Sequence, residues 1–150
     1  MIFVRGPQVA GEYREGGAIT DEDGWFSTRD EGYLDAGGYL FVRGRADDTI
    51  IRGGENIAPA EIEAVMYQHP AVEQVAVVGV PDEEWGQRIA AFVVRRAGVD
   101  ATVEDIRAFV RERLRSAKTP DSIYFVDDLP HSATGKLLRR ELLEQLPVSR

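Results

Sequence analysis

Cysteine is absent from this 150-residue sequence, and histidine occurs only twice. Without thiols the chain can form neither a disulfide nor a thiolate metal site. His69 and His131 have no acidic or histidine neighbour at the spacing of metal ligands, so we predict no metal site. No apolar run approaches the ~18 residues that a membrane helix needs, and no signal-peptide pattern opens the chain. We therefore expect a cytoplasmic protein without a transmembrane segment.

Positive charge is also in short supply. Lys and Arg together number 18 and Asp and Glu number 26, so the formal net charge is −8. This balance argues against binding to nucleic acids or anionic membranes, because a basic face supplies most of that affinity. The 43% hydrophobic and 29% charged content is typical of a folded globular protein with one or two small domains.

The first 46 residues carry strand and turn patterns, and no helix signal precedes residue 58. Residues 2–5 form a β-rich run that Gly6-Pro7 stops. Residues 32–44, "GYLDAGGYLFVRG", contain two β-rich runs around Asp35-Ala36-Gly37-Gly38. This arrangement predicts a hairpin.

The pattern changes near Arg45 to Asp48, where we place a domain boundary between segments 1–46 and 47–150. After it we expect a short hairpin around Gly53-Gly54, a helix from Pro59 to Pro70, strands at 71–80 and 88–96, a helix behind the Thr102–Asp105 capping box, a strand at 122–128 and a helix at 136–146. This order predicts an α+β fold: a small β-rich segment, then a domain whose three-stranded sheet is covered by helices.

The Gly135-Lys136 pair invites a phosphate-binding interpretation. A phosphate-loop NTPase is excluded, because Pro130 and Leu137 stand where that motif needs a glycine and a hydroxyl residue. A solvated lysine is the plain alternative. Against it, a cation at the start of the predicted helix would oppose the helix dipole unless an anion shares the site. For Arg139 and Arg140 a solvated helix face is the favoured interpretation.

Three other features each allow two interpretations. Asp47 and Asp48 fit either a turn or a functional pair. The pair Gly53-Gly54 fits a left-handed turn, or a backbone that passes close to a narrow substrate. Trp85, in the predicted polar loop 81–87, is either an aromatic at the edge of the core or a flat surface that stacks on a nucleobase.

Four segments resemble, in order, the closing motifs of adenylate-forming acyl-CoA synthetases. The resemblance extends over nearly the whole chain, and the order of the motifs makes it specific where any one alone would be weak. The segments are "GWFSTRDEGYLDAGGYL" (24–40), "GRADDTIIRGGENIAPAEIE" (44–63), "GVPDEEWGQ" (79–87) and "LPHSATGKLLRREL" (129–142).

The resemblance implies that ATP, with Mg²⁺, activates a carboxylate to an acyl-adenylate and that the acyl group then passes to coenzyme A. It also implies that residues 1–46 end the large AMP-binding domain and that 47–150 form a small mobile domain, which turns about a hinge between the two steps. The residues implied by position are Asp30, Arg45 and Lys136 for ATP or AMP, with Lys136 as the adenylation lysine, Asp47 for the hinge, and Gly53, Gly54 and Trp85 for coenzyme A.

These residue types suit that chemistry. Attack of a carboxylate on the α-phosphate needs positive charge aimed at the oxygens of both groups, which a long, mobile lysine can supply. A carboxylate such as Asp30 can accept hydrogen bonds from both ribose hydroxyls. A pair of glycines admits a thin pantetheine arm where a side chain would block it.

The chain departs from the family pattern in two ways. Arg29 stands where the family usually has glycine before the aspartate. It should weaken nucleotide binding if it crowds Asp30 and strengthen binding if its guanidinium reaches a phosphate; strand geometry, in which neighbouring side chains point to opposite faces, favours the first outcome. The phosphate loop and the acyl pocket of the family are missing from these residues. We therefore expect an isolated chain that is inactive. The strands of residues 1–46 would normally complete a larger β-structure, so we also expect either self-association through that segment or a disordered N-terminal stretch. The alternative is a stand-alone module that binds coenzyme A or a nucleotide without catalysis.

Overall fold

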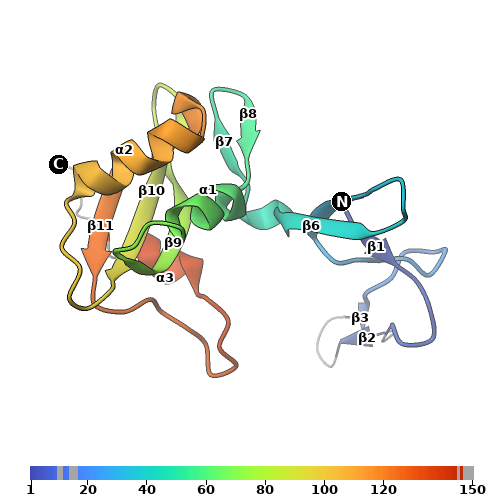
Figure 1. The fold of residues 1–150 in the computed structure, drawn as a ribbon. Coiled ribbons are helices and arrows are strands. Elements are labelled where there is room, and N and C mark those ends of the chain that lie inside the picture. The colour runs from blue at the N-terminus through green and yellow to red at the C-terminus, as the bar shows by residue number, and fades with distance from the viewer. Residues whose placement is uncertain (10–11, 14–16, 145, 147–150) are drawn as a thin grey trace. The chain divides into compact units, whose positions relative to one another are not determined.

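Short antiparallel strand pairs make up the first part of the chain in the computed structural model, which describes residues 1–9, 12–13, 17–144 and 146. This part, Met1–Asp47, is the first of two units into which the chain divides, and Asp48–Arg150 is the second. The strands of unit 1 pair as β1 with β4, β2 with β3 and β5 with β6 (Figure 1). Their bounds are β1 Phe3–Val4, β2 Glu12–Tyr13, β3 Gly17–Ala18, β4 Phe26–Ser27, β5 Asp30–Leu34 and β6 Leu40–Arg45.

The β5–β6 hairpin confirms the turn predicted at residues 35–38. The carboxylate of Asp35 accepts hydrogen bonds from the backbone N–H groups of Gly37 and Tyr39, both at 2.9 Å. Gly38 takes a φ of 81°, which glycine adopts without steric cost. The hairpin register places Asp30, the first residue of β5, opposite Arg45, the last residue of β6.

A three-stranded sheet with order β11-β10-β9 forms the centre of unit 2. Strands β9 and β10 pair antiparallel, and β10 and β11 pair parallel. The η1 turn (Ala46–Asp48) precedes these elements. Their bounds are β7 Ile50–Arg52, β8 Glu55–Ile57, α1 Pro59–Met66, β9 Val72–Asp82, β10 Gly86–Arg95, α2 Val103–Arg113, η2 Ser116–Lys118, β11 Ser122–Val126 and α3 Arg139–Glu144.

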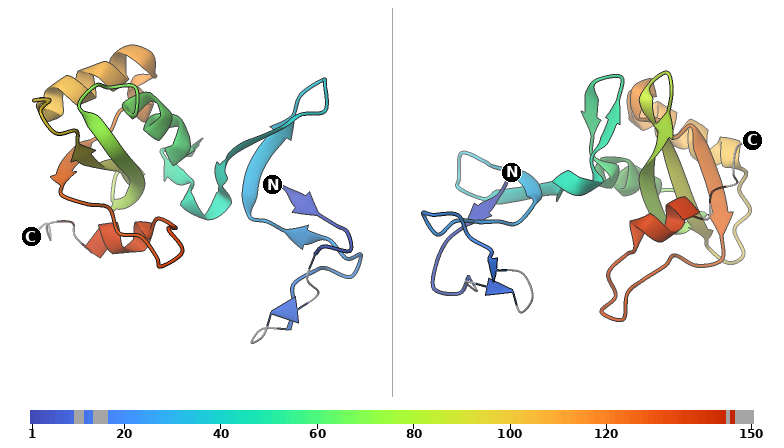
Figure 2. Two further views of the ribbon diagram at one scale, coloured as in Figure 1. Left: turned by 60° about the horizontal axis from the view of Figure 1, so that its bottom comes forward. Right: turned by 180° about the vertical axis from the view of Figure 1, so that it is seen from behind.

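Both faces of this sheet are covered. Residues that alternate along β9 and β10 face opposite sides, so Val77 packs in one buried cluster and Ala76 in the other. Helices α1 and α2 and the β7–β8 hairpin supply the first cluster, and α3 supplies Leu142 to the second. Figures 1 and 2 show α1 and α2 on one side of the sheet and α3 on the other. The predicted α+β fold with a helix-covered three-stranded sheet is confirmed.

The start of α2 follows the sequence prediction closely. Thr102 caps the helix: its hydroxyl accepts from the N–H of Asp105 at 3.2 Å, and the Asp105 carboxylate accepts from the Thr102 N–H at 2.8 Å. This reciprocal pair satisfies two of the N–H groups that a helix start leaves open. Among the described residues, no helix is both long and apolar enough to cross a membrane.

Several predicted boundaries are wrong, among them the end of the last strand, β11, which lies at Val126 and not at residue 128. Helix α1 ends at Met66 rather than at Pro70, because the backbone tightens into turns in which Gln68 bonds Val65 and His69 bonds Met66. The stretch 81–87 is mostly strand, because β9 and β10 pair as far as Asp82 and Gly86. The last helix begins at Arg139, not at Lys136.

Candidate functional site

Asp30 and Arg45 face each other because the β5–β6 register sets them opposite. The Nη1 atom of Arg45 lies 3.6 Å from Oδ1 of Asp30, and both side chains are partly exposed. The backbone N–H of Asp30 donates to the hydroxyl of Thr28 at 3.1 Å, which fixes the start of the strand. Unit 1 therefore presents a carboxylate beside a guanidinium at one end of its hairpin.

Arg29 lies just before β5 and has a φ of 59°; it is the only non-glycine residue in the described part of the chain with positive φ. This left-handed conformation favours glycine, which gives a backbone reason for the family's glycine at this position. The argument from strand geometry is wrong, because β5 begins only at Asp30. The Arg29 guanidinium points to Asp47, with Nη1 3.3 Å from Oδ2.

A hollow of about 430 Å³ lies beside these groups in unit 1. Two of the residues that line it are the cations Arg29 and Arg45, and the rest are small, polar or apolar. The lining residues are Ile19, Phe26, Ser27, Thr28, Arg29 and Arg45.

Asp47 and Asp48 lie in the η1 turn, on either side of the division between the units. The turn interpretation is thus correct for both. Their partners differ: Asp47 is bound within unit 1 by Arg29 at 3.3 Å and approached by Arg45 at 4.0 Å, whereas Asp48 is bound within unit 2 by Arg139 at 3.1 Å. Each unit therefore holds one carboxylate of the pair.

Lys136 lies in a tight loop and not at a helix start. His131 and Leu137 form an antiparallel bridge, and the backbone N–H of Ser132 donates to the Lys136 carbonyl at 2.8 Å. The Lys136 N–H in turn donates to the Ser132 hydroxyl at 3.1 Å. The argument from the helix dipole therefore does not apply. The Lys136 side chain is exposed, and no described residue forms an ion pair with it.

Arg139, three residues later, was predicted to lie on a solvated helix face, and this is wrong. Its guanidinium donates to Oε1 and Oε2 of Glu63 at 2.8 and 3.3 Å and to Asp48 at 3.1 Å, and only 22% of the side chain is exposed. Burial opposes the charge, but the Glu63 and Asp48 carboxylates outweigh it and raise the pKa of Arg139. No local pattern could reveal partners 76 and 91 residues away. Arg140, by contrast, is exposed.

Gly53 and Gly54 form the two-residue turn between β7 and β8, with φ values of 56° and 82°. Positive φ at both positions is what the tightest hairpin turns require, so the left-handed interpretation is confirmed. A Cβ at Gly54 would meet nothing within 4 Å, whereas a Cβ at Gly53 would lie 3.1 Å from the Trp85 ring. The substrate interpretation stays a prediction beside the turn geometry.

Trp85 closes the β9–β10 hairpin and is 45% exposed. Its backbone N–H donates to the Asp82 carboxylate at 2.9 Å, and its backbone carbonyl accepts from the Gly53 N–H at 2.8 Å. The fold thus brings Gly53 and Trp85 together, although 32 positions separate them in the sequence. They form one half-exposed surface with a flat aromatic ring.

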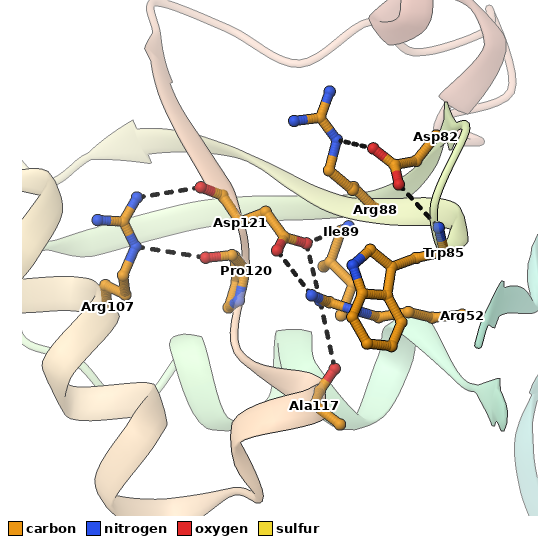
Figure 3. Close-up of polar contacts among 9 residues, drawn as sticks. All are labelled: Arg52, Asp82, Trp85, Arg88, Ile89, Arg107, Ala117, Pro120 and Asp121. Atoms are coloured by element: carbon orange, nitrogen blue, oxygen red, sulfur yellow. Dashed lines mark hydrogen bonds and ion pairs between the residues drawn. The ribbon is translucent and has the colours of Figure 1, made fainter.

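A polar network behind this surface was not anticipated from the sequence (Figure 3). Arg52 donates to both carboxylate oxygens of Asp121, each at 2.8 Å. Asp121 also accepts from the Ile89 N–H at 2.8 Å. Arg107 donates to the carbonyls of Pro120 and Asp121 at 3.3 and 3.2 Å.

The two candidate regions of unit 2 lie at different ends of it. Figures 1 and 2 place the β7–β8 hairpin at one end of the sheet and the loop between β11 and α3, which carries Lys136, at the other. Within the described residues no group of three or more His, Cys, Asp or Glu side chains is placed to hold a metal ion.

The chain as a whole resembles a family model and several known proteins. The family model described as AMP-binding enzyme C-terminal domain matches residues 61–136. A 2-succinylbenzoate–CoA ligase of Geobacillus kaustophilus is 50% identical over 149 residues, which cover 97% of this chain and 30% of that protein. A long-chain-fatty-acid–CoA ligase of Bacillus subtilis is 44% identical, over 96% of this chain and 26% of its own length.

The fold agrees as well. The structure of o-succinylbenzoate CoA synthetase from Bacillus subtilis, in complex with its acyl-adenylate intermediate, matches with a TM-score of 0.86 and 38% identity, covering 93% of this chain and 29% of that one. This chain thus spans less than a third of the length of these proteins. It belongs to the AMP-binding enzyme C-terminal domain family and corresponds to the C-terminal portion of an adenylate-forming ligase.

Proposed function

We propose that this region is the C-terminal part of an acyl-CoA synthetase, an acid–thiol ligase that makes an acyl-adenylate and then a coenzyme A thioester in the cytoplasm. The observation that carries the proposal is the match of 97% of the chain, at 50% identity, to a CoA ligase. Ligases named for different acids match with similar identity, 50% and 44%. The region therefore serves the steps these enzymes share and not the choice of acid.

In the first step Lys136 would supply positive charge to the carboxylate and the α-phosphate of MgATP. Its exposure on a tight loop supports this, because a lysine without a protein partner is free to pair with an incoming anion. Asp30, beside Arg45, would accept from the ribose hydroxyls of the nucleotide. The Asp30–Arg45 distance of 3.6 Å leaves the carboxylate able to accept further hydrogen bonds.

In the second step the surface of Gly53, Gly54 and Trp85 would receive coenzyme A. The open space at Gly54 suits a thin pantetheine arm, and the exposed part of the Trp85 ring suits stacking on a base. The β7–β8 hairpin and the loop between β11 and α3 lie at different ends of unit 2, so one placement of unit 2 would serve one step. Rotation about Asp47, at the division of the units, would exchange them.

The test separates the two half-reactions in a complete enzyme that contains this region. Lys136→Ala should abolish acyl-adenylate formation, with a loss of about 2.7–4 kcal/mol in transition-state stabilisation, and leave thioester formation from supplied adenylate largely intact. Arg140→Ala, which removes an exposed cation from the same segment, is the matched control and should change neither step. Equal damage to both half-reactions by Lys136→Ala would contradict the assignment.

The thiol surface has its own control. Asparagine tolerates positive φ, so Gly54→Asn should keep the turn while adding a side chain, and Gly54→Leu should add a larger one. Both should slow the thiol step more than adenylation, and Leu more than Asn. If adenylation suffered more, these residues would not belong to the thiol side.

A further inference from the structure

Arg52, the last residue of β7, joins three parts of unit 2. Both terminal nitrogens of its guanidinium donate to Asp121 at 2.8 Å, and only 17% and 25% of the two side chains are exposed. A two-pronged arginine–carboxylate pair fixes orientation as well as distance, which a lysine cannot do. Arg52 therefore ties the β7–β8 hairpin to the segment that leads into β11.

Asp121 is itself anchored to the sheet. Its carboxylate accepts from the Ile89 N–H at 2.8 Å, and its own N–H donates to the Ile89 carbonyl at 2.9 Å. The partner of Arg52 is thus attached to β10, the central strand. The guanidinium is held against a rigid element and not against a loose loop.

From this position Arg52 reaches Trp85. Its guanidinium carbon lies 5.8 Å from the centre of the indole ring, and Figure 3 shows the arginine side chain running behind the ring. The backbone N–H of Gly53, the next residue, donates to the Trp85 carbonyl, and a Cβ added at Gly53 would lie only 3.1 Å from the ring. Arg52 and Gly53 together form the surface on which the indole rests, while 45% of Trp85 stays exposed.

We propose that Arg52 is a positioning residue for the thiol step: held by Asp121, it fixes the Gly53-Gly54 turn and orients the Trp85 ring to stack on the base of a nucleotide-bearing thiol. The proposal deepens the proposed function and rests on it for the identity of the substrate. Arg52 acts through Trp85 and not by binding the ligand, because its side chain is only 17% exposed and its terminal nitrogens face Asp121 and, at 3.5 Å, the Ala117 carbonyl.

The first experiment uses the whole chain without ligand. Trp25→Phe leaves Trp85 as the only tryptophan, so its emission wavelength and its quenching by acrylamide report the ring alone. In this background Arg52→Met should shift the emission to the red and raise the quenching constant. Loss of an exposed cation–π contact should lower the ratio of docked to undocked rings by about two- to fivefold. Asp121→Asn, which keeps the side-chain shape, should act in the same direction.

Arg107→Met is the matched control. Arg107 bonds the same segment and is similarly buried, with 24% of its side chain exposed, but contacts the backbone of Pro120 and Asp121 instead of the Trp85 ring. It should lower the melting temperature without changing the Trp85 signals. Unchanged Trp85 signals in a folded Arg52→Met or Asp121→Asn variant would overturn the proposal, as would an equal change in Arg107→Met.

The second experiment measures the half-reactions in a complete enzyme. Arg52→Met should raise the KM for coenzyme A and leave the rate of adenylation unchanged. A shifted Trp85 signal with an unchanged KM for coenzyme A would overturn the functional part of the proposal. Trp85→Ala separates the two failures: if it too leaves the thiol step untouched, the proposed thiol surface is wrong, whereas if it impairs that step, only the role of Arg52 is wrong.

Discussion

The two units of this chain carry similar apolar side chains and bury them very differently. In unit 1 Tyr39 is 72% exposed, Leu34 66% and Val42 62%, and none of its described side chains is fully buried. Unit 2 buries both faces of a three-stranded sheet, with Phe92 only 1% exposed. Two-stranded pairs without a covered face are marginal in water, so unit 1 depends on other surfaces for its order while unit 2 contains its own core.

The largest expected effect is on association. The unpaired edges and exposed apolar side chains of unit 1 should make residues 1–150 self-associate, because such strands offer a template to another chain. Residues 48–150 should run as a monomer. Size-exclusion chromatography of both lengths at several concentrations tests this. A monomeric 1–150 chain with slowly exchanging amides in β5 and β6 would show that unit 1 is ordered without a partner and would contradict this prediction.

Two phenylalanines measure the difference in burial directly. Phe92→Ala should destabilise unit 2 by about 3–5 kcal/mol, because it leaves a cavity in a closed core. Phe41→Ala, at a position that is 46% exposed, should change the free energy of unfolding of unit 2 by no more than about 0.5 kcal/mol. Urea denaturation followed by circular dichroism gives both values. Equal losses would mean that the two units unfold as one.

The ion pairs should also contribute more to the free energy of unfolding in unit 2 than in unit 1. Arg139→Met leaves Glu63, which is 14% exposed, without its guanidinium and should destabilise unit 2 by about 2–3 kcal/mol, less than for a fully buried pair. The double variant Arg139→Met/Glu63→Gln should recover part of the loss. In a complete enzyme Arg139→Met should also slow adenylation, because α3 follows the Lys136 loop. If Arg139→Met lowered the free energy of unfolding by less than the loss of an exposed surface ion pair does, this account would be contradicted.

Arg29→Gly should stabilise unit 1, whereas Phe92→Ala and Arg139→Met should destabilise unit 2. It removes a left-handed non-glycine residue, a strain of about 1–2 kcal/mol, and removes an ion pair that is 67% and 54% exposed and therefore weak. Slower amide exchange in β5 and β6 is the expected result. Arg29→Ala removes the same ion pair but keeps the strain, so it should not slow exchange. Titration with ATP in a complete enzyme then tests whether Arg29 weakens nucleotide binding.

The smallest effect concerns acid sensitivity of the α2 cap. Hydrogen bonds from the hydroxyl and the backbone of Thr102 lower the pKa of Asp105 below its ordinary value. The folded state therefore binds that proton less readily than the unfolded state, and the cap's contribution is complete above the ordinary Asp pKa and declines as the pH falls through the lowered one. Asp105→Asn should flatten this part of the stability–pH curve of unit 2. If the stability–pH curve of Asp105→Asn is unchanged, Asp105 is not the source of this acid sensitivity.

Much of this structure was predictable from local sequence, because the interactions involved are local. Asp35 closes its hairpin turn through residues two and four positions away, and Thr102 and Asp105 cap α2 across three positions. The Gly53-Gly54 turn also follows from two adjacent residues. The roles of the candidate residues were implied by the resemblance of four short motifs to a known family, and those roles stay predictions.

Tertiary structure decided what holds those residues in place. Arg139 pairs with Glu63, 76 positions earlier, and Arg52 with Asp121, 69 positions later, and neither pair is visible as a pattern along the chain. The start of α3 depends likewise on pairing in the loop before it, where Leu138 bonds the Pro130 carbonyl and delays the helix to Arg139. Local propensity predicts that a helix or turn exists. The ends of a helix and the partners of its charged side chains depend on which distant groups fold against it. Burial strengthens these long-range pairings, and no short segment of the sequence contains them.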